Sequence, residues 1–433
     1  MRARHAITVA ILAALATVAL WWLFPRDRQT GEAPAPLQAH ASTEIERGRE
    51  LVLLGDCQGC HTAQGGRAFA GRRGIPTPFG TFFAPNITPD DATGIGSWTE
   101  ADFWHALHNG YARDGKPLYP TFPYTNYTQI SRRDVDAMYA YLRTIPAVRQ
   151  PNRAHELGFP YSQRWLLVAW RALYFRPGVY KSDPQHSAAW NRGAYLTRGL
   201  AHCSACHEAR NSLGAIQSRD NPAGGLVLDW YAPTLYSSHE AGVREWSEGD
   251  IVNLLRTGIT SGHGTAHRDS TMGPMAEVVY GSLQYAGQGD LHAMATYLKS
   301  LPERVPSGRA VFAEVAPADV PGMLERGKRL YADRCARCHG DDGEGRAPAA
   351  PALAASRAAS MRSPIDPVRI VLYGGFPPGT AGNPRPFGMP PFYQTFNNDD
   401  VASVLTYVRA SWGNRASPVS PEDVERNRTG PLW

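Results

Sequence analysis

Six cysteines and three histidines of this 433-residue sequence fall in one repeated pattern, Cys-x-x-Cys-His. The three copies are Cys57, Cys60 and His61, then Cys203, Cys206 and His207, and finally Cys335, Cys338 and His339. Two thiols at this spacing can form thioethers to the two vinyl groups of one porphyrin, and the adjacent histidine can then ligate the iron. The pattern therefore predicts three covalently attached haems c, each with a proximal histidine.

Cys-x-x-Cys pairs also occur in thioredoxin-like redox sites and in zinc modules. A zinc module gathers four Cys or His ligands locally, whereas these copies lie more than one hundred residues apart. A disulfide framework would leave the three histidines unexplained, although every cysteine of the chain belongs to a copy of the pattern. Haem attachment accounts for all nine residues.

A haem that only carries electrons usually has a second axial ligand, and methionine is a common choice. In the third copy we expect Met389 to fill this role, because it is the only methionine of a Gly/Pro-rich loop, Phe387–Phe392. The second copy offers Met272 and Met275. Alignment on Gly-Pro-Met favours Met275.

The first copy lacks a methionine at the corresponding place. Its loop, Tyr119–Tyr124, carries Phe122, which cannot ligate iron. Met138 lies at core spacing in the following helix, and His105 and His108 lie on the preceding one. We therefore expect the first haem to be five-coordinate or bound by a ligand that the sequence does not reveal.

Further signals recur around each copy. An Arg-Gly pair precedes it in an amphipathic pattern, and a closing helix that begins with Asp and contains Tyr ends each unit. The Arg-Gly pairs are Arg47-Gly48, Arg192-Gly193 and Arg326-Gly327, and the closing helices are 134–143, 290–299 and 400–409. A middle helix opens with a Ser/Thr cap in the first two copies and ends at a glycine in all three: Gly110, Gly258 and Gly374.

Each copy is also followed by Ala-Pro-x-(Ile/Leu), at Pro85, Pro233 and Pro351. We expect the carbonyl of this proline to accept a hydrogen bond from the second ring nitrogen of the proximal histidine, as in cytochrome c domains. Such a bond fixes the tautomer of the ligand and raises its basicity.

These patterns predict a mainly α chain of three tandem cytochrome c domains. The expected segments are a signal anchor or signal peptide at 1–28, domains at 43–148, 185–303 and 320–412, a linker at 149–184 and a tail at 413–433. The linker holds an apolar helix, Arg164–Phe175, which is too short to span a membrane. It either packs between the first two domains or docks on a membrane or a partner.

The N-terminus has the pattern of an export signal. Arg2 and Arg4 precede the uncharged run Ala6–Phe24. The length of this run favours an uncleaved anchor, and cleavage after Ala16 is the alternative. Both interpretations place the chain on the periplasmic side of the bacterial cytoplasmic membrane, with residues 6–24 as the anchor in the first.

The remaining composition argues against other classes of function. The formal net charge is +5, and no run of Lys and Arg indicates binding to nucleic acid. No Gly-x-Gly-x-x-Gly opens a βα unit, and no paired acids or nucleophile constellation is present. The sequence therefore indicates an electron carrier without catalytic residues of its own.

Over about residues 43–420 the chain resembles the three-haem cytochrome c subunit of bacterial membrane-associated dehydrogenases, the alcohol, gluconate and aldehyde dehydrogenase cytochrome c subunit family. The stretches that carry this resemblance are Gly80–Asp90, Tyr119–Tyr124, Asn191–Leu196 and Ser411–Asn414. The resemblance implies a catalytic partner subunit of flavin, quinoprotein or molybdenum type and electron delivery to ubiquinone or a terminal oxidase. Many members carry Tyr-Pro-Ala-Met-Pro-Tyr in the first loop, from which Phe122 departs.

Two other functions stay open at this point. Phe122 is compatible with a multihaem peroxidase- or oxidase-like enzyme that uses an open first haem, although the sequence shows no distal His/Arg pair for acid–base chemistry. A standalone periplasmic carrier without a cognate dehydrogenase is the third interpretation.

Overall fold

The computed structural model describes residues 43–217, 223–260, 269–304, 318–346 and 350–428. Over these residues the protein is mainly helical, which confirms the mainly α character of the expected fold. Within the same ranges no helix is long and apolar enough to cross a membrane. The export segment expected at 1–28 lies outside the described residues.

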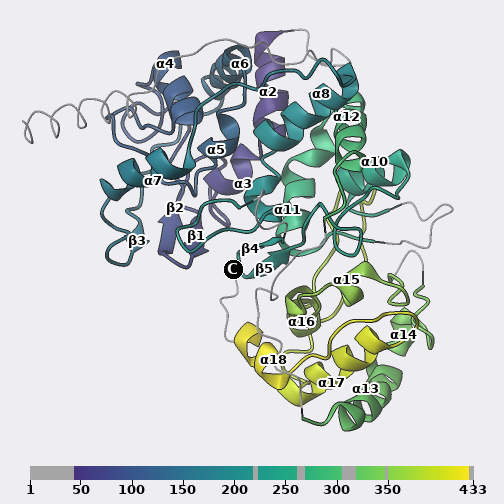
Figure 1. The fold of residues 1–433 in the computed structure, drawn as a ribbon. Helices are drawn as coiled ribbons and strands as arrows, with labels where there is room; N and C mark the ends of the chain where they lie inside the picture. Colours follow the sequence, from purple (N-terminus) through teal and green to yellow (C-terminus); the bar gives the residue numbers. More distant parts are fainter. Residues whose placement is uncertain (1–42, 218–222, 261–268, 305–317, 347–349, 429–433) are drawn as a thin grey trace, which may run out of the picture.

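Three long helix pairs form the framework of the molecule (Figure 1). In each pair, the helix that precedes a Cys-x-x-Cys-His copy packs against the helix that closes the unit. The pairs are α2 (Glu44–Leu54) with α6 (Arg132–Leu142), α8 (Ala188–Tyr195) with α12 (Gln288–Lys299), and α13 (Val320–Arg334) with α17 (Asn398–Ala410). The closing helices lie where the sequence predicts them.

A glycine sits at each crossing point. A Cβ added at Gly48 or Gly193 would lie 1.9 Å from the carbonyl oxygen of the facing helix, and one at Gly327 would lie 2.1 Å from it. The facing carbonyls belong to Ala137, Ala293 and Ser403. Only a residue without a side chain allows the two backbones to approach this closely, which explains the glycine of the repeated Arg-Gly pair.

The arginine of each pair binds the aspartate at the start of the closing helix. Arg47 pairs with Asp134, whose carboxylate is fully buried. The equivalent pairs join Arg192 to Asp290 and Arg326 to Asp400, each with a shortest N–O distance of 2.7 Å. The Arg-Gly signal thus has two parts, one that ties the helix ends together and one that lets the helices touch.

The middle helices differ more among the units. They are α4 (Glu100–Trp104), which continues as a π-helical turn to Asn109, α10 (Glu248–Thr257) and α16 (Ile365–Tyr373). The expected Ser/Thr caps are present, because the Thr99 and Ser247 side chains accept hydrogen bonds from the amides three residues on. All three helices end at the predicted glycines, which have φ values of 64°, 78° and 66°.

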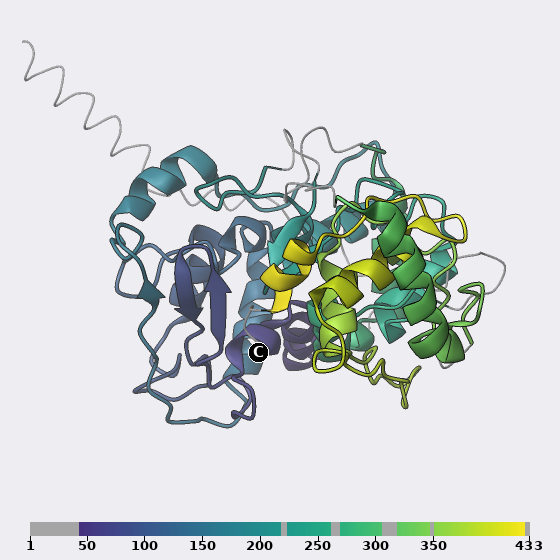
Figure 2. The same cartoon turned by 90° about the horizontal axis from the view of Figure 1, so that it is seen from below.

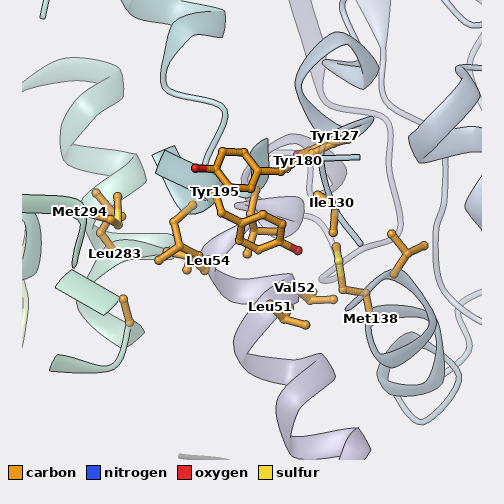
Figure 3. Packing of buried hydrophobic residues seen from close by; sticks show 14 of the residues in the cluster. Leu51, Val52, Leu54, Tyr127, Ile130, Met138, Tyr180, Tyr195, Leu283 and Met294 are labelled. Carbon is orange, nitrogen blue, oxygen red and sulfur yellow. The ribbon is translucent and has the colours of Figure 1, made fainter. Parts of the chain in front are cut away.

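The first two units share one hydrophobic core, whereas the third has its own. Val52 and Leu54 of α2, Met138 of α6, and Tyr195 of α8 meet in the shared core (Figure 3). The Tyr195 hydroxyl donates to the Asp134 carboxylate at 2.5 Å. The Arg47–Asp134 ion pair of the first unit is therefore hydrogen-bonded to the second unit as well. The third unit forms a separate lobe in Figure 1.

Short elements complete the units. Strands β1 (Gly74–Thr77) and β2 (Gly80–Phe83) lie side by side in Figure 2 and pair antiparallel. Ile75 lies opposite Phe82 in this pair, and β3 (Glu156–Leu157) adds to β2. The second unit has the hairpin β4 (Gly225–Val227) and β5 (Trp230–Ala232). Other helices are α5 (Tyr124–Tyr127), α7 (Leu166–Tyr174), α11 (Gly273–Gly281), α15 (Arg357–Ser360) and α18 (Pro421–Arg428). No sequence pattern indicated the sheets.

The segment after residue 413 belongs to the core of the third unit. Val419 and Val424 are fully buried, and α18 packs against α16 and α17. This segment therefore does more than wrap over the surface, as a polar tail would.

The second and third units meet where α16 packs against β5. The Tyr231 amide donates to the Asp366 carboxyl at 2.9 Å, and the Arg369 guanidinium lies 5.3 Å from the centre of the Trp230 ring. Loss of solvent raises the pKa of Asp366 to about 7, although the Tyr231 hydrogen bond and the Arg369 charge act in the opposite direction.

The crossing of α8 and α12 gives a first prediction. Gly193→Ala forces the helices apart, because its Cβ meets the Ala293 carbonyl oxygen, and we expect a loss of roughly 1–3 kcal/mol in the free energy of unfolding. Gly249→Ala is the control. It lies in α10 with its nearest neighbour 3.8 Å away and should gain roughly 0.5–1 kcal/mol. Denaturant titration of the haem-loaded protein, followed by circular dichroism, measures both, and equal effects would contradict the close crossing.

A second prediction concerns pH. Asp366 ionises near its ordinary pKa of 3.8 in the unfolded chain but only near pH 7 in the fold, so the folded state binds its proton more tightly. Ionising Asp366 therefore lowers the free energy of unfolding. This loss of stability is absent below about pH 4, grows between pH 4 and 7, and then stays constant. The melting temperature of the wild type should therefore fall relative to Asp366→Asn over this window. Asp399→Asn, an exposed carboxylate of α17, should leave the difference from wild type flat.

Candidate haem sites and their connections

Each Cys-x-x-Cys-His copy forms one short helical turn at the end of the first helix of its pair. The turns are α3 (Cys57–His61), α9 (Ser204–His207) and α14 (Ala336–His339). Residues three apart on a helix lie on one side, so the two thiols of each copy share a face. None of the six cysteines, all of them described, forms a disulfide. The thiols are therefore free for thioether bonds.

The proximal histidines are held by the predicted prolines. The Nδ1 atoms of His61 and His207 lie 2.7 Å from the carbonyl oxygens of Pro85 and Pro233. The third copy repeats this contact between His339 and Pro351 at 3.0 Å. A ring that donates from Nδ1 to a carbonyl presents the lone pair of Nε2, which is the atom an iron needs.

Burial lowers the pKa of all three histidines, and the proline carbonyls oppose this only in part. The rings are therefore neutral near pH 7, as ligation requires. Two thiols and a neutral, oriented imidazole on one turn form the donor set of a c-type haem, and the residues present fit that group.

The predicted methionine ligands lie on different kinds of structure. Met275 lies in the first turn of α11 and packs, half-buried, against the shared core. Met389 lies in a loop whose backbone bridges to Gly375, with amide-to-carbonyl distances of 2.9 and 3.1 Å, and packs against the core of the third unit. Met272 immediately precedes α11 as its cap.

The first unit fills the corresponding region with aromatic side chains. Phe122 packs against the shared core, with its ring centre 5.4 Å from that of Tyr127. Met138 is buried in α6 as a core residue. His108 is buried and stacks on Trp104 at 4.3 Å, whereas His105 lies 2.8 Å from the Asn109 amide through Nδ1. His108 therefore serves packing rather than a solvent-exposed helix end.

The first and second Cys-x-x-Cys-His copies lie close together, which the sequence did not reveal. The Tyr127 hydroxyl donates to the carbonyl of Gly55, two residues before Cys57, at 3.0 Å. The ring of His202, which immediately precedes Cys203, lies 5.3 Å from the Tyr127 ring. Burial lowers the pKa of His202 to about 4, so this contact is uncharged at neutral pH. The only signal in the sequence for a role of His202 was its position directly before Cys203.

A second connection runs through α11. Arg73 donates to the Gly59 carbonyl inside the first copy at 2.7 Å and pairs with Glu277 of α11 at 2.7 Å. The helix α11 also packs directly against α3. The element that carries Met275 of the second unit therefore contacts the haem-attachment turn of the first.

The second and third units meet through their own distal loops. A Cβ on Gly375, the backbone partner of Met389, would lie 2.9 Å from the Met272 methyl group. The Thr380 hydroxyl donates to the Thr257 carbonyl at the end of α10 at 3.3 Å. The loops that carry Met389 and Met272 are therefore in direct contact.

Comparison with known proteins agrees with this geometry. A cytochrome c family model matches residues 45–146 and 324–412. The quinone-type alcohol dehydrogenase cytochrome c subunit of Gluconobacter oxydans is 36% identical over 401 residues, which are 89% of this chain and 82% of that protein. The gluconate 2-dehydrogenase cytochrome c subunit of Pantoea cypripedii is 36% identical over 397 residues, 88% of each chain.

A larger relative contains a similar region. A nicotinate dehydrogenase subunit of Pseudomonas putida is 39% identical over 404 residues, which are 92% of this chain. The chain spans only 32% of the length of that protein. Because relatives that it matches over most of their length are named cytochrome c subunits, the chain belongs to the family of cytochrome c subunits of bacterial dehydrogenases, whose role is electron transfer rather than catalysis.

Proposed function

We propose that this chain carries electrons through three covalently attached haems c, from a catalytic dehydrogenase subunit to ubiquinone or a terminal oxidase. One observation carries the proposal: each of the three Cys-x-x-Cys-His turns has its histidine held by a proline carbonyl, beside an Arg–Asp-tied helix pair. When bound, haem c supplies a one-electron redox centre.

The residues of the chain set the properties of each centre. His207 with Met275 and His339 with Met389 are the proposed axial pairs of the second and third haems. The corresponding loop of the first unit carries Phe122, which packs beside Tyr127, so the first haem has no methionine ligand in this proposal. A methionine ligand raises the potential, so the second and third haems should have higher potentials than the first, other factors being equal.

Contacts between neighbouring units support a path for electrons inside the chain. The first and second attachment turns are joined by Tyr127 and by α11, and the second and third units touch at Met272 and Gly375. Neighbouring haems can then exchange electrons without a diffusing carrier.

The partner and the location complete the proposal. The names of the relatives support a dehydrogenase partner, and the sequence resemblance extends this to flavin, quinoprotein or molybdenum types. We place the chain on the periplasmic side of the bacterial cytoplasmic membrane, anchored by residues 6–24. Several relatives are named as subunits of dehydrogenases, which favours this function over the peroxidase-like and standalone alternatives.

The function is tested with the complex co-purified from native membranes. Adding the dehydrogenase substrate should reduce all three haems of this chain, and adding a ubiquinone analogue should reoxidise them. Haem reduction by rapid mixing and absorbance is the measurement. A chain that purifies without a dehydrogenase, or stays oxidised beside one that turns over, contradicts the proposal.

The number of haems gives a third prediction. The intact mass should exceed that of the polypeptide by three haem groups, and Cys203→Ala with Cys206→Ala should remove one of them. The outer units should keep theirs, because their thiols and histidines lie on separate turns. A wild-type mass with fewer than three haems refutes the assignment.

The axial ligands give a fourth prediction. The ferric protein should show the methionine–iron charge-transfer band from two haems and a high-spin component from the first. Met275→Ala and Met389→Ala should each remove one share of the band and lower one potential. Met272→Ala is the matched control, since it alters the methionine that caps the helix carrying Met275. Loss of the band in this control instead would transfer the role to Met272.

A further inference from the structure

The linker helix α7 is apolar on both of its faces. Its inner side buries Leu167 and Arg171, with Phe175 just beyond its end. Its outer side exposes Trp165 by 68% and Leu173 by 69%. A helix that is apolar all round is normally buried, so the exposed side calls for a second surface to cover it.

The exposed side chains form one continuous surface. Along α7 the exposed positions Trp165, Val168, Ala169, Ala172 and Leu173 recur at the three-to-four spacing of one helix face. Tyr174 borders this face, and the preceding loop adds two aromatic rings. This α7 patch consists of Phe159, Tyr161, Trp165, Val168, Leu173 and Tyr174, each at least 39% exposed. The helix lies at the outer edge of the first unit (Figure 1).

Inward contacts hold the patch in place. The Arg171 guanidinium lies 4.3 Å from the centre of the Tyr111 ring and 5.2 Å from that of Tyr124. Arg164 donates to the Pro117 carbonyl at 2.8 Å, and the Trp170 indole donates to the Leu213 carbonyl of the second unit at 2.9 Å. Because these contacts join α7 to the first and second units, the orientation of its outward face is fixed.

The segment that carries the patch is basic. Residues 157–182 contain four basic side chains and no Asp or Glu: Arg164, Arg171, Arg176 and Lys181. Arg176 and Lys181 are exposed, and Arg164 is half-buried. Exposed Trp, Tyr, Phe and Leu beside Arg and Lys are the composition of helices that lie in the interface of an anionic membrane.

We propose that the α7 patch docks on the anionic surface of a lipid bilayer, with α7 in the interface plane. The aromatic and aliphatic side chains enter the headgroup region, and the exposed Arg176 and Lys181 contact lipid phosphates. This inference rests on the proposed location at the membrane and names the surface that faces it. A protein interface would also accept the aromatic side chains, but a segment with basic and no acidic side chains favours a surface of uniform negative charge.

Docking also fixes which unit lies nearest the lipid. The Tyr119 hydroxyl, in the loop that carries Phe122, donates to the Tyr161 carbonyl of the patch at 3.1 Å, and the Arg164 guanidinium lies 5.6 Å from the centre of the Tyr119 ring. The loop over the first haem site is therefore attached to the docking surface itself.

The test measures hydrogen–deuterium exchange of the full-length, haem-loaded chain, with and without vesicles. The probes are vesicles of phosphatidylcholine alone and of phosphatidylcholine with phosphatidylglycerol. Peptides within 157–176 should exchange more slowly with the anionic vesicles, and added salt should weaken this protection. Because the readout is local, the N-terminal segment does not confound it.

A matched pair of variants sharpens the test. Trp165→Glu with Leu173→Glu should abolish the protection, whereas Phe376→Glu, which alters a 65% exposed ring of the third unit, should retain it. Haem spectra confirm that both variants fold. Unchanged exchange in the wild type with anionic vesicles overturns the proposal. Protection that occurs only when the dehydrogenase is bound also overturns it, and makes the patch a subunit interface.

Failure of this inference is separable from failure of the proposed function. Substrate-driven haem reduction is measured in detergent solution on the same variants, where no bilayer is present. We expect the Trp165→Glu, Leu173→Glu chain to be reduced like the wild type. Loss of reduction in the wild type would refute the electron-transfer role, while the exchange data would still decide the docking surface.

Discussion

The close crossing of the first and last helices of each unit is the constraint on which the structure depends. A glycine lets the helix backbones touch, and the neighbouring arginine ties the crossing to the first turn of the closing helix. This crossing fixes the end of the first helix, and the Cys-x-x-Cys-His turn follows there. The orientation of the thiols and of the imidazole is therefore set by a contact between backbones.

Local signals in the sequence predicted the parts of the fold that depend on local chemistry. The closing helices and the capped middle helices with their terminal glycines follow from residues close in sequence to the feature they specify. The His–Pro hydrogen bonds join residues up to 26 positions apart, and the threefold Ala-Pro-x-(Ile/Leu) pattern indicated them. The pairing of Arg192 with Asp290 was not foreseen, although both residues stood out in the repeats. Each recurred for a reason that only the three-dimensional contact supplies.

Several contacts between the units could not be predicted, because they join residues that follow no repeat. Tyr127, His202 and Glu277 have no counterparts in the other units that could mark them. The small sheets are likewise made of strands of two to four residues, too short for an alternating pattern to be recognised. The double-sided apolar character of α7 was visible in the sequence, but only the structure decided which side was exposed.

The carboxylate of Asp134 accepts from both Arg47 and Tyr195, so one buried group belongs to two units at once. Together with the common core, this shared carboxylate makes the first two units one structural domain. A gene truncated before the third unit would still encode a closed core. A gene that lost only the second unit would expose the apolar side of α2 and leave Asp134 with half of its partners. Evolution can therefore add or remove haem units at the C-terminal end of this chain more readily than in its middle.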